Sequence, residues 1–134
     1  MKAYRYSKIS TIVFLFICLI AFCNEQEYEI VGHWTKDDSH AFTVCTKITD
    51  LDKLQEFGET MPYNFGKNTT VYFFTEKEQT PDISDWPQES WTWLIIAIRD
   101  SEHFANCSAI FDRLSSGDER IIEEPAKYLK DTLF

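Results

Sequence analysis

Glycine, proline and histidine are scarce in this 134-residue chain, which contains four glycines, four prolines and three histidines. A loop that cradles phosphate needs closely spaced glycines, and Gly32, Gly58, Gly66 and Gly117 are too dispersed to form one. The serines also lack the Gly-x-Ser-x-Gly context of a nucleophile elbow. We therefore predict that the protein is not an enzyme, and the sequence indicates no cofactor.

The three histidines lack the short spacing that is typical of metal ligands on one helix. His103 stands apart, whereas His33 and His40 flank Asp37 and Asp38 across one predicted hairpin. Two imidazoles and two carboxylates would form a cation site if their side chains converged. A polar turn carries the same residues for ordinary solvation, and we favour that interpretation, so we predict no metal site.

Only one long hydrophobic run exists, and it covers residues 12–23. Its 12 residues fall short of the roughly 20 that a membrane-spanning helix needs. Three basic residues precede the run, and the chain becomes polar directly after it. This pattern is typical of an export signal, which we assign to residues 1–23; a short retained anchor helix is the alternative.

The end of this signal has two interpretations. The segment Leu19-Ile20-Ala21-Phe22-Cys23 resembles a bacterial lipoprotein signal, although Phe22 stands where a small residue is usual. The resemblance implies that Cys23 is acylated and holds the protein at the periplasmic or outer surface of a membrane. The alternative is ordinary cleavage before Asn24, which implies a secreted or periplasmic protein. We favour acylation.

Residues 24–134 form a segment of 111 residues, the size of one compact domain. Three of the 13 basic residues and none of the 22 acidic residues precede Asn24, so this segment carries 10 basic and 22 acidic side chains, a formal charge of −12. Such a charge argues against binding to nucleic acid and against direct adhesion to anionic lipids. Membrane contact is therefore expected only through a lipid on Cys23, and a basic protein partner is compatible with the charge.

Two cysteines, Cys45 and Cys107, remain in the segment after Cys23. Export would place them where disulfides persist, and we predict that they form one across neighbouring strands. The alternative is a pair of buried thiols, because cysteine packs well as a small apolar residue.

The hydrophobic pattern predicts an α+β fold: a single small domain with a largely antiparallel sheet packed by one or two helices. A helix is expected from Thr49, which forms a capping box with Asp52, to Pro62. Residues 90–98 suit either a strand or a helix, and we favour the strand because of its isoleucines and tryptophans. The other strands are expected at residues 28–34, 42–48, 69–75, 107–114 and 119–123.

Aromatic side chains are the most distinctive feature of the predicted domain. Trp86, Trp91 and Trp93 lie within eight residues, at the edge of an acidic loop that contains two prolines. Exposed indoles anchor protein partners or stack on sugar rings, whereas buried indoles belong to the core. We hypothesise a non-catalytic domain that binds a protein or peptide partner; a carbohydrate- or small-ligand-binding module that uses residues 86–93 is the alternative.

Overall fold

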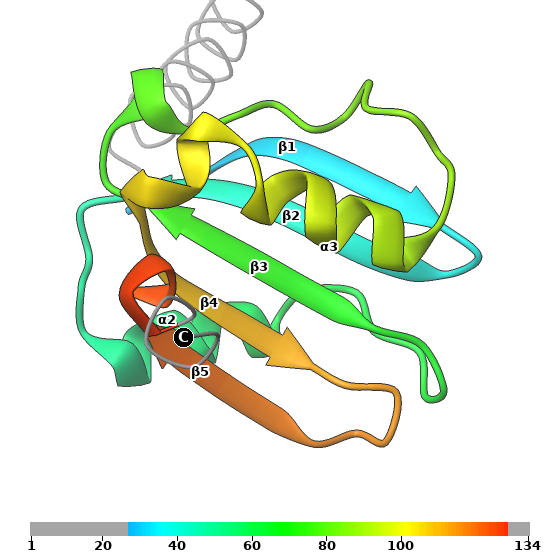
Figure 1. The fold of residues 1–134 in the computed structure, drawn as a ribbon. Helices are drawn as coiled ribbons and strands as arrows, with labels where there is room; N and C mark the ends of the chain where they lie inside the picture. The colour runs from blue at the N-terminus through cyan, green and yellow to red at the C-terminus, as the bar shows by residue number, and fades with distance from the viewer. Residues whose placement is uncertain (1–26, 129–134) are drawn as a thin grey trace, which may run out of the picture.

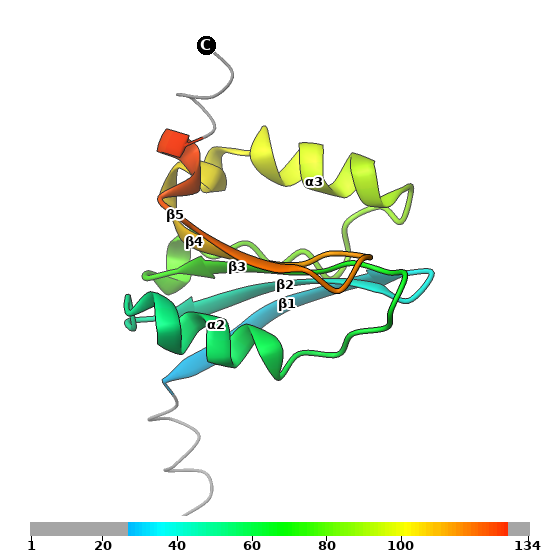
Figure 2. The same ribbon diagram turned by 90° about the horizontal axis from the view of Figure 1, so that it is seen from below.

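A sheet runs through the centre of the protein and carries helices on both faces (Figures 1 and 2). The computed structural model describes residues 27–128. The predicted export signal at residues 1–23, including Cys23, lies outside this part of the chain. Within residues 27–128, no helix has the length and apolar character needed to cross a membrane.

The sheet has five strands that lie side by side in chain order. Three of the four neighbouring pairs are antiparallel, and only β2 and β3 are parallel. The prediction of an α+β domain with a largely antiparallel sheet is confirmed. The strands are β1 (Tyr28–Lys36), β2 (Ser39–Thr46), β3 (Thr69–Phe74), β4 (Cys107–Arg113) and β5 (Glu119–Glu123).

Helix α2 (Leu51–Glu59) makes the crossover that the parallel pair β2–β3 requires. Its existence confirms the helix prediction, but the predicted capping box at Thr49 is wrong. Asp50 is the N-cap, because its carboxylate accepts hydrogen bonds from the backbone N–H groups of Asp52 at 2.9 Å and Lys53 at 3.4 Å. A carboxylate at this position satisfies N–H groups that the helix itself leaves unpaired.

Residues 91–99 form helix α3 (Trp91–Arg99), so the prediction of a strand at 90–98 is wrong. The helix begins at Ser90, whose Oγ accepts a hydrogen bond from the backbone N–H of Trp93 at 3.0 Å. Leu94 and Ile98 are both fully buried and lie four residues apart, the spacing of one helix face. This contact with the sheet outweighs the strand preference of the isoleucines and tryptophans.

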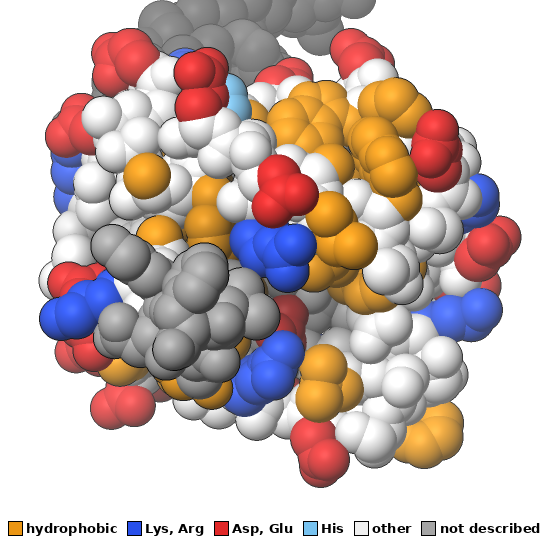
Figure 3. Space-filling view, in the orientation of Figure 1, with side chains coloured by type: hydrophobic (Ala, Val, Ile, Leu, Met, Phe, Trp, Pro, Cys, Tyr) orange, Lys and Arg blue, Asp and Glu red, His pale blue; other side chains and the backbone are white. Residues whose placement is uncertain are grey.

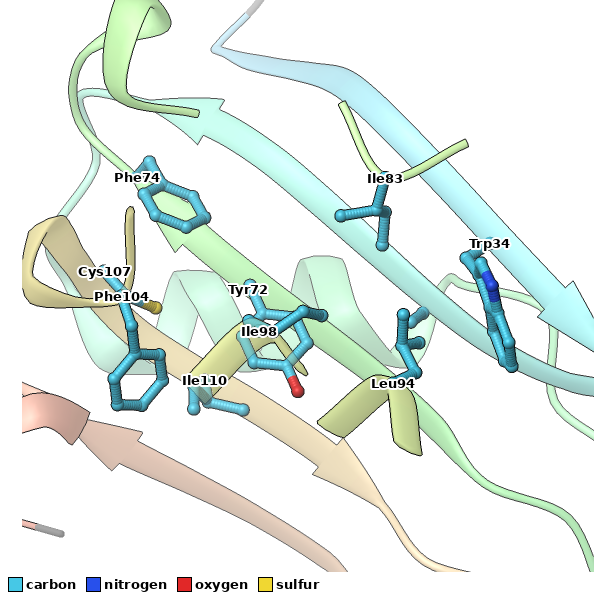
Figure 4. Close-up of a cluster of buried hydrophobic side chains, with 10 residues drawn as sticks. Trp34, Tyr72, Phe74, Ile83, Leu94, Ile98, Phe104, Cys107 and Ile110 are labelled. Atoms are coloured by element: carbon cyan, nitrogen blue, oxygen red, sulfur yellow. The ribbon is translucent and has the colours of Figure 1, made fainter. Parts of the chain in front are cut away.

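The two faces of the sheet have separate hydrophobic cores. Every residue of β3 is buried, because this central strand contributes side chains to both faces. The α2 core contains Phe42, Val44, Leu54, Val71, Phe73, Ala109 and Phe111. The α3 core, shown in Figure 4, contains Trp34, Ala41, Tyr72, Phe74, Ile83, Leu94, Ile98, Phe104, Cys107 and Ile110.

Two tight turns set the hairpins at opposite edges of the sheet. Asp37 and Asp38 join β1 to β2 with φ values of 51° and 66°, as in a two-residue turn of type I′. The strands predicted at 107–114 and 119–123 pair as the hairpin of β4 and β5, and Gly117 in its turn has a positive φ of 91°. The first of these turns brings His33 and His40 onto the same face of the sheet.

Candidate binding surface on helix α3

Helix α3 exposes an apolar side chain on the side that faces away from the sheet, where Ile96 lies between Thr92 and Arg99. Ile96 points outward and is 42% exposed, which makes it one of four large hydrophobic side chains that are exposed in residues 27–128. We define the α3 surface as the apolar side chains of α3 that remain partly or fully exposed: Trp91, Trp93, Ile95, Ile96 and Ala97.

This surface forms a continuous hydrophobic area over α3 and the loop that leads to it (Figure 3). Seven of the nine residues of α3 are apolar, and a helix this apolar is normally covered on most of its sides. Within residues 27–128, however, the sheet covers only the side of α3 that carries Leu94 and Ile98. The α3 surface therefore has the composition of a contact area.

The tryptophans of the predicted site are brought together but are half-buried. Trp86, Trp91 and Trp93 each pack against the α3 core with part of the side chain and keep the rest in solvent. The ring of Trp91 lies 6.2 Å from that of Trp34, with the planes tilted by 49°. Because residues 91–99 are a helix and not the predicted strand, Trp91 and Trp93 both belong to α3.

Trp86 is positioned by a loop that follows the outer edge of β1. In this loop the Ser84 hydroxyl accepts a hydrogen bond from the backbone N–H of His33 at 3.1 Å. The side-chain amide of Gln88 donates to the carbonyl of Thr35 at 3.0 Å. A loop along an edge strand satisfies backbone groups that would otherwise pair with another chain. It also holds Trp86 against the α3 core.

Acidic side chains flank both ends of α3. Asp85 and Glu89 precede the helix, Asp100 and Glu102 follow it, and all four are exposed. Arg99 is the only basic residue in the helix, and its Nε lies 3.3 Å from the Asp100 carboxylate. The α3 surface is thus an apolar area between negative charges.

A polar pocket of about 340 Å³ adjoins the N-terminal end of α3. It lies between the β1–β2 turn, the segment before β3 and the start of α3. Trp91 supplies an aromatic wall, and Asp37, Lys67 and Asn68 are among the polar residues that line it. Polar side chains around one indole suit a small hydrophilic molecule.

The predicted disulfide between Cys45 and Cys107 is wrong, because both are free thiols. Cys45 lies on β2 and Cys107 on β4, and each is in register with Phe74 on the intervening strand β3. Strands are about 4.8 Å apart, so two residues separated by a strand lie roughly 9–10 Å apart, beyond the reach of a disulfide. Burial raises the pKa of the Cys107 thiol to about 12.

His33 and His40 meet, although the two aspartates between them do not complete a metal site. His33 Nε2 and His40 Nδ1 lie 2.9 Å apart. Desolvation and the charge of His40 lower the pKa of His33. No group of three or more histidine, cysteine or acidic side chains in residues 27–128 is arranged to hold a metal ion. His103 lies elsewhere, 4.0 Å from the Glu102 carboxylate.

Ile96 is the site residue that sequence analysis missed, because the predicted strand at 90–98 has a different side-chain periodicity from the helix that forms. A signal for it exists in the chain: Ser90 is a good N-cap, and seven of the nine residues after it are apolar, more than one face of a helix can hold. The chain matches no known protein-family model, and neither a characterised protein nor a solved structure shows significant similarity to it.

Proposed function

We propose that this protein is an exported, non-catalytic binding domain that recognises a protein or peptide partner through the α3 surface. The observation that carries the proposal is the exposure of Ile96 on the outward side of α3, together with the half-buried indoles of Trp91 and Trp93 on the same helix. Aromatic side chains are frequent hot spots of protein interfaces, and a half-buried indole is already held in place by the core. Little side-chain entropy is then lost on binding.

The charges around α3 indicate the chemistry of the partner. Acidic residues flank both ends of the helix, and the segment that begins at Asn24 has a formal charge of −12. A complementary partner presents apolar side chains with lysine or arginine beside them. The negative charge accelerates encounter with such a partner, so association slows as salt concentration rises.

Export and lipid attachment remain part of the proposal, supported by the sequence of residues 1–23. The experiment is metabolic labelling with a palmitate analogue in wild-type protein and in the Cys23→Ala variant. Label that is lost only in the variant supports acylation. Each methylene group of the acyl chain that is buried in the membrane contributes about 0.8 kcal/mol to anchoring. Label that persists in the variant, or is absent from both, contradicts acylation of Cys23.

Photo-cross-linking in the native host tests the binding surface. A photoreactive amino acid replaces Thr92, an exposed residue on the outer side of α3. We expect one discrete adduct, whose yield falls when Ile96→Glu places a charge in the apolar surface. Phe65→Glu is the matched control, because Phe65 is 81% exposed but lies outside α3.

The two variants separate the proposal from general loss of surface hydrophobicity. Adduct lost in the Ile96 variant and kept in the Phe65 variant supports binding through α3. Equal loss in both, or no loss in the Ile96 variant, contradicts it. The adduct should also decline with added salt, since the proposed partner is basic.

The polar pocket beside Trp91 supports a second candidate function, the binding of a sugar or another small polar molecule. Titration with a panel of mono- and disaccharides, followed by tryptophan fluorescence, tests it. Binding that is lost in Trp91→Ala and retained in Ile96→Glu favours the pocket. No response to any saccharide at millimolar concentration contradicts this candidate.

A further inference from the structure

His33 and His40 face each other edge to edge across the β1–β2 hairpin. Their facing nitrogens, Nε2 of His33 and Nδ1 of His40, are 2.9 Å apart. The ring centroids are 5.2 Å apart and the planes differ by 22°. This centroid separation results when the facing nitrogens lie near the line that joins the ring centres, so the rings share an N–H···N hydrogen bond in nearly one plane.

The rings are held in this arrangement by Phe42 beneath them. The His33 ring stacks on the Phe42 ring at 4.3 Å with planes 10° apart, and the His40 ring lies 6.1 Å away at 14°. The hairpin register places His33 opposite Phe42 and fixes all three residues on one face. Stacking restrains tilting of the imidazoles but leaves them free to swing within their common plane.

We propose that His33 Nε2 and His40 Nδ1 together chelate one late divalent transition-metal ion of the Ni²⁺ or Cu²⁺ type. Metal–imidazole bonds are about 2.0–2.1 Å long, so two ligands at a 90° angle have nitrogens about 2.9 Å apart. That angle belongs to the tetragonal geometry of Ni²⁺ and Cu²⁺. The observed separation of 2.9 Å has this value. Each facing lone pair lies along the line that joins the two nitrogens, so each ring must swing by about 45° within the common plane to direct its lone pair at one metal ion.

Proton placement on the rings is compatible with chelation. One facing nitrogen carries the shared hydrogen, and in a neutral imidazole this hydrogen can reside on either ring nitrogen. When the metal binds, that hydrogen moves to the outer nitrogen of the same ring, and both facing nitrogens become ligands. The described residues supply no third ligand, so water completes the coordination shell and the site stays open.

The inference is independent of the α3 surface, because the histidine pair lies with Phe42 on the α2 side of the sheet. A metal bound to both strands would brace the hairpin and stabilise the folded protein in proportion to its occupancy. Hard cations such as Mg²⁺ prefer oxygen ligands and should have no such effect.

A Ni²⁺ titration of the full-length chain in detergent tests the site. We expect paramagnetic broadening of the His33 and His40 ring signals in NMR spectra, with the His103 signals unaffected. The melting temperature should rise with Ni²⁺ and stay constant with Mg²⁺. This measurement uses the wild-type protein, so it does not depend on whether a variant folds. Sharp His33 and His40 signals at saturating Ni²⁺ would overturn the proposal.

Matched variants identify the ligands. His33→Gln and His40→Gln should each weaken Ni²⁺ binding on the order of 10²-fold, because one ligand then binds without the other. His103→Gln is the histidine control and Cys45→Ala the thiol control, and both should bind Ni²⁺ as the wild type does. Unchanged affinity in the two hairpin variants, or a loss of binding confined to Cys45→Ala, would overturn the assignment.

Discussion

Gly58→Ala is the substitution for which local rules and the tertiary structure predict opposite results. Gly58 lies inside helix α2, where alanine is normally favoured over glycine by about 1 kcal/mol. A Cβ at this position would come within 2.3 Å of Phe111 Cδ1, 2.4 Å of Cγ and 2.8 Å of Cε1. Real Cβ atoms do not approach other atoms so closely, so either the Phe111 ring or the helix must move.

The loss of stability in Gly58→Ala depends on how far the Phe111 ring can move. Phe111 has no exposed surface and lies in the α2 core, so its ring cannot move into solvent. Overpacking a core costs about 1–3 kcal/mol, and the severity of this clash places the cost near the upper end. The gain in helix propensity offsets about 1 kcal/mol. We therefore expect a net loss of about 2 kcal/mol in the free energy of unfolding.

Urea unfolding followed by tryptophan fluorescence measures this change. The urea concentration at the midpoint should fall, while the slope of the free energy of unfolding against urea concentration stays the same. Glu56 is exposed on the same helix, so Glu56→Gly and Glu56→Ala provide the control for propensity alone. They should differ by about 1 kcal/mol in favour of alanine.

A double-mutant cycle with Phe111→Leu tests whether the clash is the cause. The smaller side chain gives the new methyl group space, so the two substitutions should cost less together than the sum of their separate effects. A coupling of at least about 1 kcal/mol is expected for side chains in contact. Gly58→Ala protein as stable as the wild type, or additive effects in the cycle, would refute the reasoning.

Three further predictions concern single side chains. The pKa of Cys107 is raised from 9.0 to about 12, so the stability that its neutral thiol contributes is complete below pH 9 and is lost as pH rises towards 12. The loss amounts to about 1.4 kcal/mol per pH unit. Cys107→Ala should remove this pH dependence from the free energy of unfolding measured with urea between pH 8 and 11. Asp112→Ala should cost about 1.5–3 kcal/mol in thermal unfolding, because the buried hydroxyl of Thr70 donates to its carboxylate at 2.6 Å, and Thr70→Val should make the same change smaller. Ser90→Ala should cost about 0.5–2 kcal/mol, whereas Ser90→Asp retains the cap of α3; equal circular-dichroism melts for the two variants would contradict the capping role.

Much of the sheet could be predicted because its signals are local. Residues 69–74 are dense in β-branched and aromatic side chains and too few for a helix, and they form the central strand β3. Gly117 marks the turn between β4 and β5, because a positive φ favours glycine. Each of these patterns has one dominant interpretation within a few residues, so these elements could be predicted without knowledge of contacts to distant parts of the chain.

The candidate site could be predicted only in part. The tryptophans at 86, 91 and 93 were identified from their clustering, and they do lie around one apolar area. Ile96 was not identified, since its exposure depends on the face that α3 turns away from the sheet. An apolar run of this length fits a strand or a helix, and the contact of Leu94 and Ile98 with the sheet outweighs the strand preference of isoleucine and tryptophan.

What the sequence by itself determined, then, was the class of the fold and most of its strands, because alternation and turn residues act over a few positions. Only the tertiary structure decided which distant side chains meet. Cys45 and Cys107 are kept apart by β3, which lies between their strands, whereas His33 and His40 are brought to 2.9 Å by a hairpin register. Strand order and register depend on the packing of the whole chain, and the spacing of two residues along the sequence does not reveal them.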